Sequence, residues 1–267
     1  MAGIVMFGKN TNTGPSPGLW GLAPRDVFYD PAVAYGFSQE FVDLPILVDG
    51  AEAVIAGGGG WKGFGSTGAA AVSGAQDDED GGSYSLASDL ANEGASISGG
   101  HAPHKLTRLA EDFFFECRIK ASTVVANDLG FFVGMMGITA ASAVIPIEAA
   151  DDIADTNLVG FHYPGGATTS IGTLYRADSV AEVDVKTAAV TIAAATYLKL
   201  GMVVQKGKLT FFLNGVPLAD TKSLPDGTGT DFPADTFMRP IIAMLHGSGA
   251  TGDVTASWIH TRQLRVM

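Results

Sequence analysis

The chain has 267 residues and a formal net charge of −12. Without a basic patch, such a surface repels phosphate backbones, so we expect no direct binding to nucleic acid. Hydrophobic residues account for 46% and charged residues for 16%, which excludes a disordered polyelectrolyte and predicts a sizeable core. The 35 glycines and the scarcity of amphipathic runs favour short strands with tight turns over long helices.

The sequence predicts neither a cleaved secretory signal nor a membrane span. The first apolar run, Ile4 to Phe7, is too short for a signal-peptide core and follows no basic segment. No stretch approaches the ~20 apolar residues that a membrane span requires. Cys117 is the only cysteine, so no intramolecular disulfide can form, and we expect a buried thiol. These features predict a soluble protein made in a reducing cytoplasm.

The first 36 residues are predicted to form an extended arm. Four prolines interrupt any regular element in this stretch, yet it carries several aromatic residues, among them Phe7, Trp20, Phe28 and Tyr29. Disordered tails are poor in aromatic residues, because aromatic side chains favour burial. We therefore expect the arm to pack along its own domain or along a neighbouring subunit, and a flexible leader is the alternative.

Three stretches of the first half contain residue types that occur in ligand sites, but the sequence favours a loop in each case. A phosphate-binding loop in the run Gly57 to Gly74 would need a following helix and a Lys-Ser/Thr pair, but Lys62 precedes a glycine. The acidic run Asp77 to Asp80 lacks the alternating ligands of an EF-hand, which favours a solvated loop over a Ca²⁺ site. His101 and His104 have no further zinc ligands nearby, so we expect exposed loop histidines. No metal and no cofactor is expected.

A period-two hydrophobic pattern predicts strands along most of the remaining chain. In the run from Glu111, Phe113, Phe115, Cys117 and Ile119 share one face, as in a half-buried antiparallel strand. Leu129 to Ile138 is apolar on both faces and predicts a central strand. Other predicted strands are Ser83 to Leu86, Ala95 to Ser98, Leu158 to Tyr163, Ile171 to Arg176, Val180 to Lys186, Pro240 to His246 and Val254 to Val266. The Ala-rich stretch Ala140 to Asp155 predicts a short helix or a long loop.

The stretch from Tyr197 to Leu218 predicts a hairpin followed by a second turn. Leu198, Leu200, Met202 and Val204 alternate along the first strand, and Leu209, Phe211 and Leu213 along the second. Lys206-Gly207 separates them, and Asn214-Gly215 starts a further extended run. With turns every ten to fifteen residues and no helices between them, the chain is predicted to be all-β, a sandwich or a barrel.

The order of these strands resembles the concanavalin A-like, laminin-G-like jelly roll. The resemblance rests on FFFECRIKAS (113–122), LGFFVGMMGI (129–138), NLVGFHY (157–163) and the hairpin, and it covers Phe37 to Met267. It is most similar to a version found in structural proteins of tailed-phage virions. The resemblance implies an antiparallel jelly-roll β-sandwich over residues 37–267, with the arm, residues 1–36, outside it.

The resemblance also implies a function and partners. We expect a structural virion protein, most specifically a capsid decoration protein on the phage head surface, made in the host cytoplasm. Its partners would be the major capsid protein or other virion subunits, with no membrane contact. We expect a homo-oligomer, specifically a trimer, that forms through the arm. Phe7, Trp20, Phe28 and Tyr29 are the expected interface residues.

The sandwich class also includes lectins and glycoside hydrolases. A hydrolase of this class would carry paired catalytic carboxylates on one strand face. Glu182 and Asp184 share one strand face, but Lys186 and Thr187 follow where a further carboxylate would be required. No Gly-x-Ser-x-Gly motif occurs and no catalytic triad can be identified. We therefore expect no enzyme and no catalytic residue. A carbohydrate-binding, lectin-like module for host attachment is the alternative.

In that alternative, exposed aromatic and acidic side chains would contact a glycan. Trp61, Tyr163 and Asp226 are the candidates, although packing in the core or at a sheet edge explains the same residues and is preferred.

Overall fold

The structure is a computed structural model. It describes residues 13–39, 53–54, 61–65, 74–76, 83–87, 91–99, 104–106, 111–137, 153–165, 169–224, 231–233, 236–249 and 252–265. The predicted helix or loop at Ala140 to Asp155 lies mostly outside these residues. Across the described ranges, no helix has the length and apolar character needed to cross a membrane.

The described chain is built almost entirely of strands, which follow a single short helix, α1 (Pro17–Trp20). The strands of the first half are β1 (Ala34–Tyr35), β2 (Ser38–Gln39), β3 (Ala53–Val54), β4 (Trp61–Gly65), β5 (Gly74–Gln76), β6 (Tyr84–Ala87), β7 (Gly94–Gly99), β8 (His104–Lys105), β9 (Phe113–Ala121) and β10 (Leu129–Gly137). Those of the second half are β11 (Leu158–Tyr163), β12 (Ser170–Arg176), β13 (Val183–Thr191), β14 (Leu198–Gln205), β15 (Lys208–Leu213), β16 (Val216–Ser223), β17 (Phe237–His246) and β18 (Asp253–Leu264).

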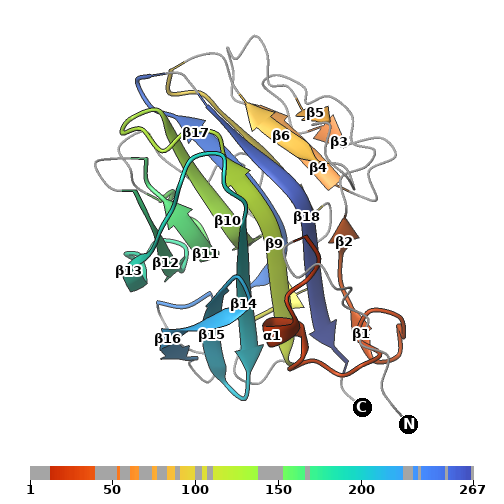
Figure 1. The fold of residues 1–267 in the computed structure, drawn as a ribbon. Coiled ribbons are helices and arrows are strands. Elements are labelled where there is room, and N and C mark those ends of the chain that lie inside the picture. The colour runs from red at the N-terminus through yellow and green to blue at the C-terminus, as the bar shows by residue number, and fades with distance from the viewer. Residues whose placement is uncertain are drawn as a thin grey trace.

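Two antiparallel sheets form the two layers of the molecule (Figure 1). Sheet A has the order β16-β15-β14-β9-β18-β6-β5, and β1 and β2 also pair with β18. Sheet B has the order β13-β12-β11-β10-β17-β7-β4-β3, and β8 pairs with β17. The predicted all-β antiparallel sandwich is therefore confirmed.

The main core lies between the two sheets. Alternate residues of β9 and β14 point into it, including Phe115, Cys117, Leu200 and Met202. They meet inward-facing residues of sheet B such as Phe161. Cys117 is buried, as predicted, and its free thiol faces the Leu200 carbonyl. Burial of these apolar side chains is the main stabilising contribution to the sandwich.

The predicted hairpin is confirmed as β14 and β15, and the run after the second turn is β16. Lys206 and Gly207 both have positive φ, of 51° and 71°. Asn214 and Gly215 repeat this pattern with 49° and 78°. Two successive residues with positive φ match the right-handed twist of the flanking strands, which explains why these dipeptides occupy the turns.

Residues 13–39, which we call the strap, lie along the outer face of sheet A. They form a second apolar cluster with that sheet, consisting of Leu19, Trp20, Val27, Ala34, Phe114, Val203 and Phe212. At its end, the strap joins sheet A through β1 and β2, which pair with β18 (Figure 1). The described part of the predicted arm, residues 13–36, packs along its own domain. Packing against a neighbouring subunit stays a prediction.

Candidate functional site

The outer face of sheet B brings together side chains that are distant in the sequence. The pairing register places His162 of β11 beside Phe132 of β10, and Phe132 beside Ala243 of β17. Ala243 in turn pairs with Ser96 of β7. Ser98 lies two residues further along β7 and shares the face of Ser96. His162 and Ser96 are three strand spacings apart, which is about 14 Å.

Three of these side chains end in buried polar atoms. His162 Nε2, Ser96 Oγ and Ser98 Oγ have no hydrogen-bond partner within the described part of the chain. His162 is only 7% exposed, and burial lowers its pKa to about 4, so the imidazole is neutral at neutral pH. Buried polar atoms are nearly always hydrogen-bonded in native proteins. Ser96 and Ser98 are 0% exposed, so these atoms are closed to solvent in this structure. Their unused hydrogen-bonding capacity would suit a ligand or a water molecule admitted to this face.

A buried cation lies on the same face. Arg239 pairs with Met136 of β10, and Ala243 is four residues further along β17. Alternate residues of a strand share a face, so Arg239 and Ala243 point to the same side of the sheet. The Arg239 residue is 7% exposed. Hydroxyl, imidazole and guanidinium groups thus share one sheet face.

Apolar side chains fill the space between these polar groups. They form a cluster separate from the main core, made of Phe132, Met136, Ile153, Leu158, Leu174, Ile241, Ala243 and Leu245. Gly134 and Gly160 pair beneath the Phe132 ring, and a Cβ at Gly160 would lie 2.8 Å from the Gly134 Cα and 2.9 Å from the Phe132 Cζ. The two glycines therefore allow β10 and β11 to approach closely, and Gly160 leaves room for the end of the Phe132 ring.

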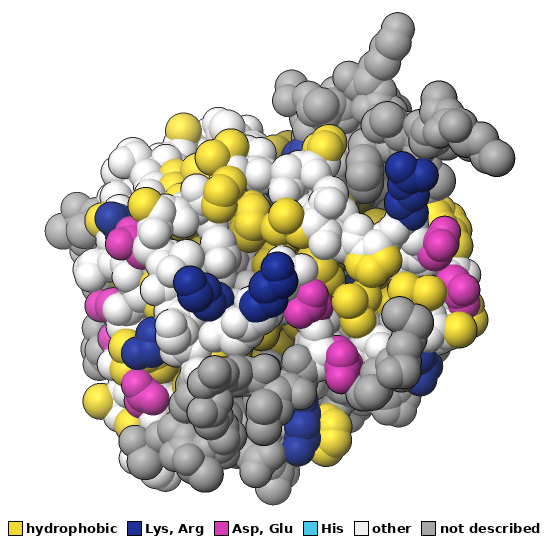
Figure 2. All heavy atoms as spheres, turned by 90° about the horizontal axis from the view of Figure 1, so that it is seen from below, with side chains coloured by type: hydrophobic (Ala, Val, Ile, Leu, Met, Phe, Trp, Pro, Cys, Tyr) yellow, Lys and Arg dark blue, Asp and Glu magenta, His cyan; other side chains and the backbone are white. Residues whose placement is uncertain are grey.

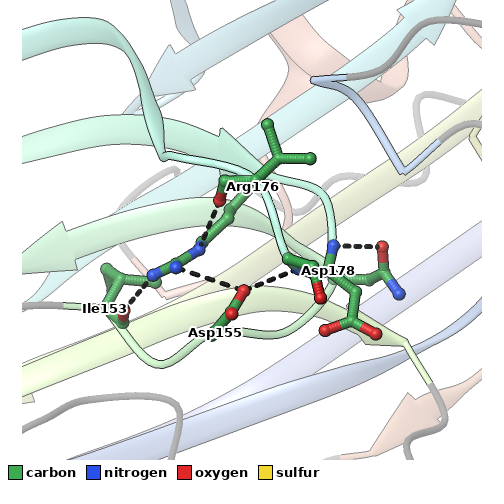
Figure 3. A network of polar contacts seen from close by, with 7 residues as sticks. Ile153, Asp155, Arg176 and Asp178 are labelled. Carbon is green, nitrogen blue, oxygen red and sulfur yellow. Dashed lines mark hydrogen bonds and ion pairs between the residues drawn. The ribbon is translucent and has the colours of Figure 1, made fainter.

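One end of this face is held by the polar network of Figure 3. Arg176 Nε donates to the Val180 carbonyl at 2.8 Å, and Nη1 donates to the Ile153 carbonyl. Arg176 Nη2 lies 3.1 Å from Asp155 Oδ1, which also accepts the Ser179 backbone N–H at 2.7 Å. The guanidinium thereby fixes the segment that carries Ile153 onto the apolar cluster.

The predicted hydrolase carboxylates lie elsewhere, at the β13 edge of sheet B. Glu182 and Asp184 are both exposed. Asp184 is in contact with the Thr187 hydroxyl at 3.4 Å, and the neighbouring Lys186 forms an ion pair with Asp220. The structure does not place these carboxylates with the buried polar atoms of the outer face.

The aromatic candidates for glycan contact are core residues. Trp61 and Tyr163 both belong to the main core, which confirms packing as the explanation for these two side chains. Asp226 lies outside the described residues. The more exposed ring of Phe237 is covered by Lys105 Nζ at 4.8 Å, and that of Tyr197 by the Arg118 guanidinium at 3.5 Å. Cations therefore occupy ring faces that could otherwise stack on a sugar.

The expectation of exposed histidines is wrong for His104. Its ring is fully buried in β8, stacks on Tyr35 at 5.7 Å between centroids, and places Nε2 3.0 Å from Thr261 Oγ1. Burial lowers its pKa to about 3. Tyr35 and Phe37 of the strap pack against this ring, which the local sequence could not indicate. His101 and the acidic run Asp77 to Asp80 lie outside the described residues.

The expected interface residues of the arm have different surroundings. Trp20 is 3% exposed and packs on its own sheet A. Phe28 is partly buried against Trp20, with 4.6 Å between ring centroids. Tyr29 is 67% exposed. Phe7 lies outside the described residues, so Tyr29 and part of Phe28 are the members of this set that face outward.

Sequence reasoning missed Ser96, Ser98, His162 and Arg239. Each interrupts an otherwise apolar strand, which is a weak signal, because isolated polar residues are common on the solvent face of a strand. Only the pairing of β7, β17, β10 and β11 reveals that the four share one face.

Comparison with known proteins supports the fold. No protein-family model and no curated protein matches the sequence. Among solved structures, a protein of unknown function from Shewanella oneidensis MR-1 is 10% identical, with a TM-score of 0.56, covering 88% of this chain and 90% of that one. Rv0315 of Mycobacterium tuberculosis, described as an immunostimulatory antigen and pseudo β-1,3-glucanase, is 13% identical, with a TM-score of 0.53, covering 85% and 98%.

The carbohydrate recognition domain of Emp47p is 11% identical, with a TM-score of 0.51, covering 88% of this chain and 98% of that chain. Similarity at this level of identity shows a shared fold. The chain therefore has the concanavalin A-like sandwich found in lectin-type and glycoside hydrolase-type proteins.

The prediction that the protein is not an enzyme is wrong. It relied on the lack of recognisable catalytic motifs, but this architecture also occurs in Rv0315, described as a pseudo β-1,3-glucanase. Since function depends on the site and not on the fold, missing sequence motifs do not exclude catalysis here.

Proposed function

We propose that this protein binds a carbohydrate, and that a ligand admitted to the outer face of sheet B contacts the polar groups that are buried there in this structure. The observation that carries the proposal is the alignment of His162 Nε2, Ser96 Oγ and Ser98 Oγ, three buried polar atoms with no partner among the described residues. Ligand sites typically combine an apolar lining with a few placed polar groups. Phe132 and Ala243 supply the apolar part between them.

The chemistry of this face suits a sugar. A pyranose ring has hydroxyl groups at its rim and C–H groups on its faces, so it needs hydrogen-bonding side chains beside an apolar surface. A neutral imidazole and two serine hydroxyls can each donate and accept. The likeness to the carbohydrate recognition domain of Emp47p is consistent with this proposal.

Glycan binding by the purified protein tests the proposal. The protein would be applied to a panel of oligosaccharides, and any that bind would be titrated by calorimetry. Ser96→Ala/Ser98→Ala and His162→Ala should each weaken binding about tenfold or more, because each leaves ligand hydroxyls without a partner. Ser223→Ala, on the exposed edge strand β16, is the matched control and should bind as the wild type does.

Two outcomes would count against the proposal. One is the absence of binding to every oligosaccharide. The other is a ligand whose affinity is unchanged by the serine and histidine substitutions in variants that keep the wild-type circular dichroism. Release of reducing sugar, measured in the same samples, tests whether binding leads to cleavage.

A second candidate function is that of a virion component, with a capsid or tail subunit as partner. It is favoured by the outward-facing apolar side chains of the strap, where Leu22 is 47% and Tyr29 is 67% exposed. Figure 2 shows the lower end of the molecule in Figure 1, where hydrophobic side chains lie among Lys, Arg, Asp and Glu. Leu22→Ala/Tyr29→Ala should reduce incorporation into particles, whereas the exposed Val125→Ala should not. Equal incorporation of both variants would argue against this role.

A further inference from the structure

A buried carboxylate lies beneath the strap, on the sheet opposite the proposed carbohydrate site. Glu116 of β9 is 1% exposed. Its Oε2 accepts the Ser16 backbone N–H at 2.9 Å and the Trp20 indole N–H at 2.8 Å. Its Oε1 has no hydrogen-bond partner among the residues that the structure describes. The strap thus supplies both hydrogen bonds that anchor this carboxylate.

The surroundings of Glu116 are mostly apolar. Trp20, Phe114, Val203 and Phe212 belong to the cluster between strap and sheet. Burying an ionised carboxylate among such side chains is costly unless it is fully compensated. Desolvation accordingly raises the pKa of Glu116, and the hydrogen bonds from Ser16 and Trp20 and the charge of Lys199 offset this only in part.

The neighbouring strands contribute further titratable and charged groups. Lys199 is on β14, Arg118 follows two residues after Glu116 on β9, and Arg262 is on β18. His260 of β18 is the direct cross-strand neighbour of Glu116. Burial lowers the pKa of His260 to about 3, so its ring is neutral in the range where a carboxyl group titrates. Asp26 and Asp30 of the strap are exposed. Glu116 is therefore the buried carboxyl group of this interface, and its pKa is raised from the ordinary value.

The strap is also fitted to the sheet by shape. A Cβ at Gly201 would overlap the Cδ1 atom of Leu19, and a Cβ at Gly215 would lie 2.6 Å from the Cβ of Ser16. Gly201 thus leaves space for Leu19 of the strap, and Gly215 leaves space for Ser16. Apolar packing and shape do not depend on pH. The ionisation of Glu116 is therefore the contribution to the docking free energy that changes with pH.

We propose that the strap is a pH-responsive cover of sheet A, held more firmly when Glu116 is protonated and released more readily when it is ionised. The group has a higher pKa when docked than when exposed to water, so the docked state binds the proton more tightly. The extra docking stability is fully present below the ordinary glutamate pKa and is lost as the pH rises through the docked pKa. The proposal does not depend on carbohydrate binding at sheet B.

Proton exchange of the Trp20 indole, measured by NMR on the full chain, tests this proposal. Trp20 reports on the strap. Because Phe37 of the strap packs on Trp61, the backbone N–H of Phe161, a main-core residue on β11 of sheet B, is measured as the internal reference. After correction for intrinsic rates, protection of Trp20 should fall by up to tenfold per pH unit above about pH 4.3, until the docked pKa is passed. Protection of the Phe161 N–H should not follow this course.

Glu116→Gln should abolish the pH dependence of Trp20 protection. Asp178→Asn, which changes an exposed carboxylate in the turn between β12 and β13, should leave it unchanged. Because the Gln variant could fail to fold, the Glu116 carboxyl of the wild type would also be titrated by ¹³C NMR. A titration midpoint at or below the ordinary glutamate value would overturn the proposal. So would Trp20 protection that follows the Phe161 N–H at every pH, or that keeps its pH dependence in a folded Glu116→Gln variant.

Discussion

Leu19 of the strap occupies the space directly over Gly201 of β14, where a Cβ on the glycine would overlap the leucine Cδ1 atom. The strap is therefore matched to sheet A by shape at this position, and not only by general apolar character. The next residue of β14, Met202, pairs with Phe115 of β9. Phe115 points to the opposite side of sheet A, into the main core. The contact between Leu19 and Gly201 can thus be changed without touching that core.

Gly201→Ala should lower the free energy of unfolding by about 1–3 kcal/mol, because the added methyl group displaces Leu19. Leu19→Ala should cost about 2–5 kcal/mol through the cavity that it leaves. In the double variant the two changes should compensate in part, since the shortened side chain of the strap leaves room for the methyl group added to β14. Urea unfolding of the four proteins gives the coupling energy. Strictly additive effects would show that the two positions do not share this space.

Stability should decrease steeply between about pH 6.5 and pH 4. His104, His162 and His260 are buried, with pKa values lowered to about 3, 4 and 3 from 6.5. In this window the unfolded chain takes up protons on these residues and the folded protein does not. Each histidine therefore stabilises the fold fully above pH 6.5, and this contribution is lost as the pH falls.

For His162 the shift from 6.5 to about 4 corresponds to about 3 kcal/mol, at 1.36 kcal/mol per unit. Urea unfolding at several pH values measures the slope. His162→Gln should reduce this slope by about one proton, whatever its effect on stability at pH 7. An unchanged slope would mean that His162 is not neutral in the folded protein.

Arg176→Ala should destabilise the protein more than Asp155→Ala. The arginine donates to the carbonyls of Ile153 and Val180 and forms an ion pair with Asp155, so its removal leaves two backbone acceptors unpaired. We expect a loss of about 2–3 kcal/mol for Arg176→Ala and about 1 kcal/mol for the more exposed aspartate. Thermal unfolding compares the two variants, and an equal loss would assign the effect to the ion pair alone.

Ala195→Gly should stabilise the protein by about 0.5–1 kcal/mol. Ala195 has φ of 52°, in the left-handed region that costs an L-residue about 1–2 kcal/mol and glycine very little. The side chain is exposed, so little packing is lost. Ala194→Gly, at an exposed neighbour without positive φ, is the control and should be neutral or destabilising. Melting temperatures of both variants check the difference in sign.

The strands and turns of the sandwich could be predicted because their signals are local. The alternation in β9 and β14 and the dipeptides Lys206-Gly207 and Asn214-Gly215 act over a few residues, through side-chain direction and backbone φ. The same local pattern correctly assigned Cys117 to the core. Aromatic residues in the arm likewise indicated that it packs on a surface, because aromatic side chains favour burial.

The sequence by itself therefore determined which residues of each strand face inward and where the chain turns. Only the tertiary structure decided which outward faces are covered. Glu116 lies on the strand face opposite Phe115 and Cys117, and His104 lies in a predicted loop, so the local sequence places both in solvent. The strap and β1 bury them instead. Ser96 and His162 come together only through the order of strands in sheet B. Period-two alternation distinguishes the two sides of a strand, but contacts between distant segments determine whether the outer side meets water, another segment or a ligand.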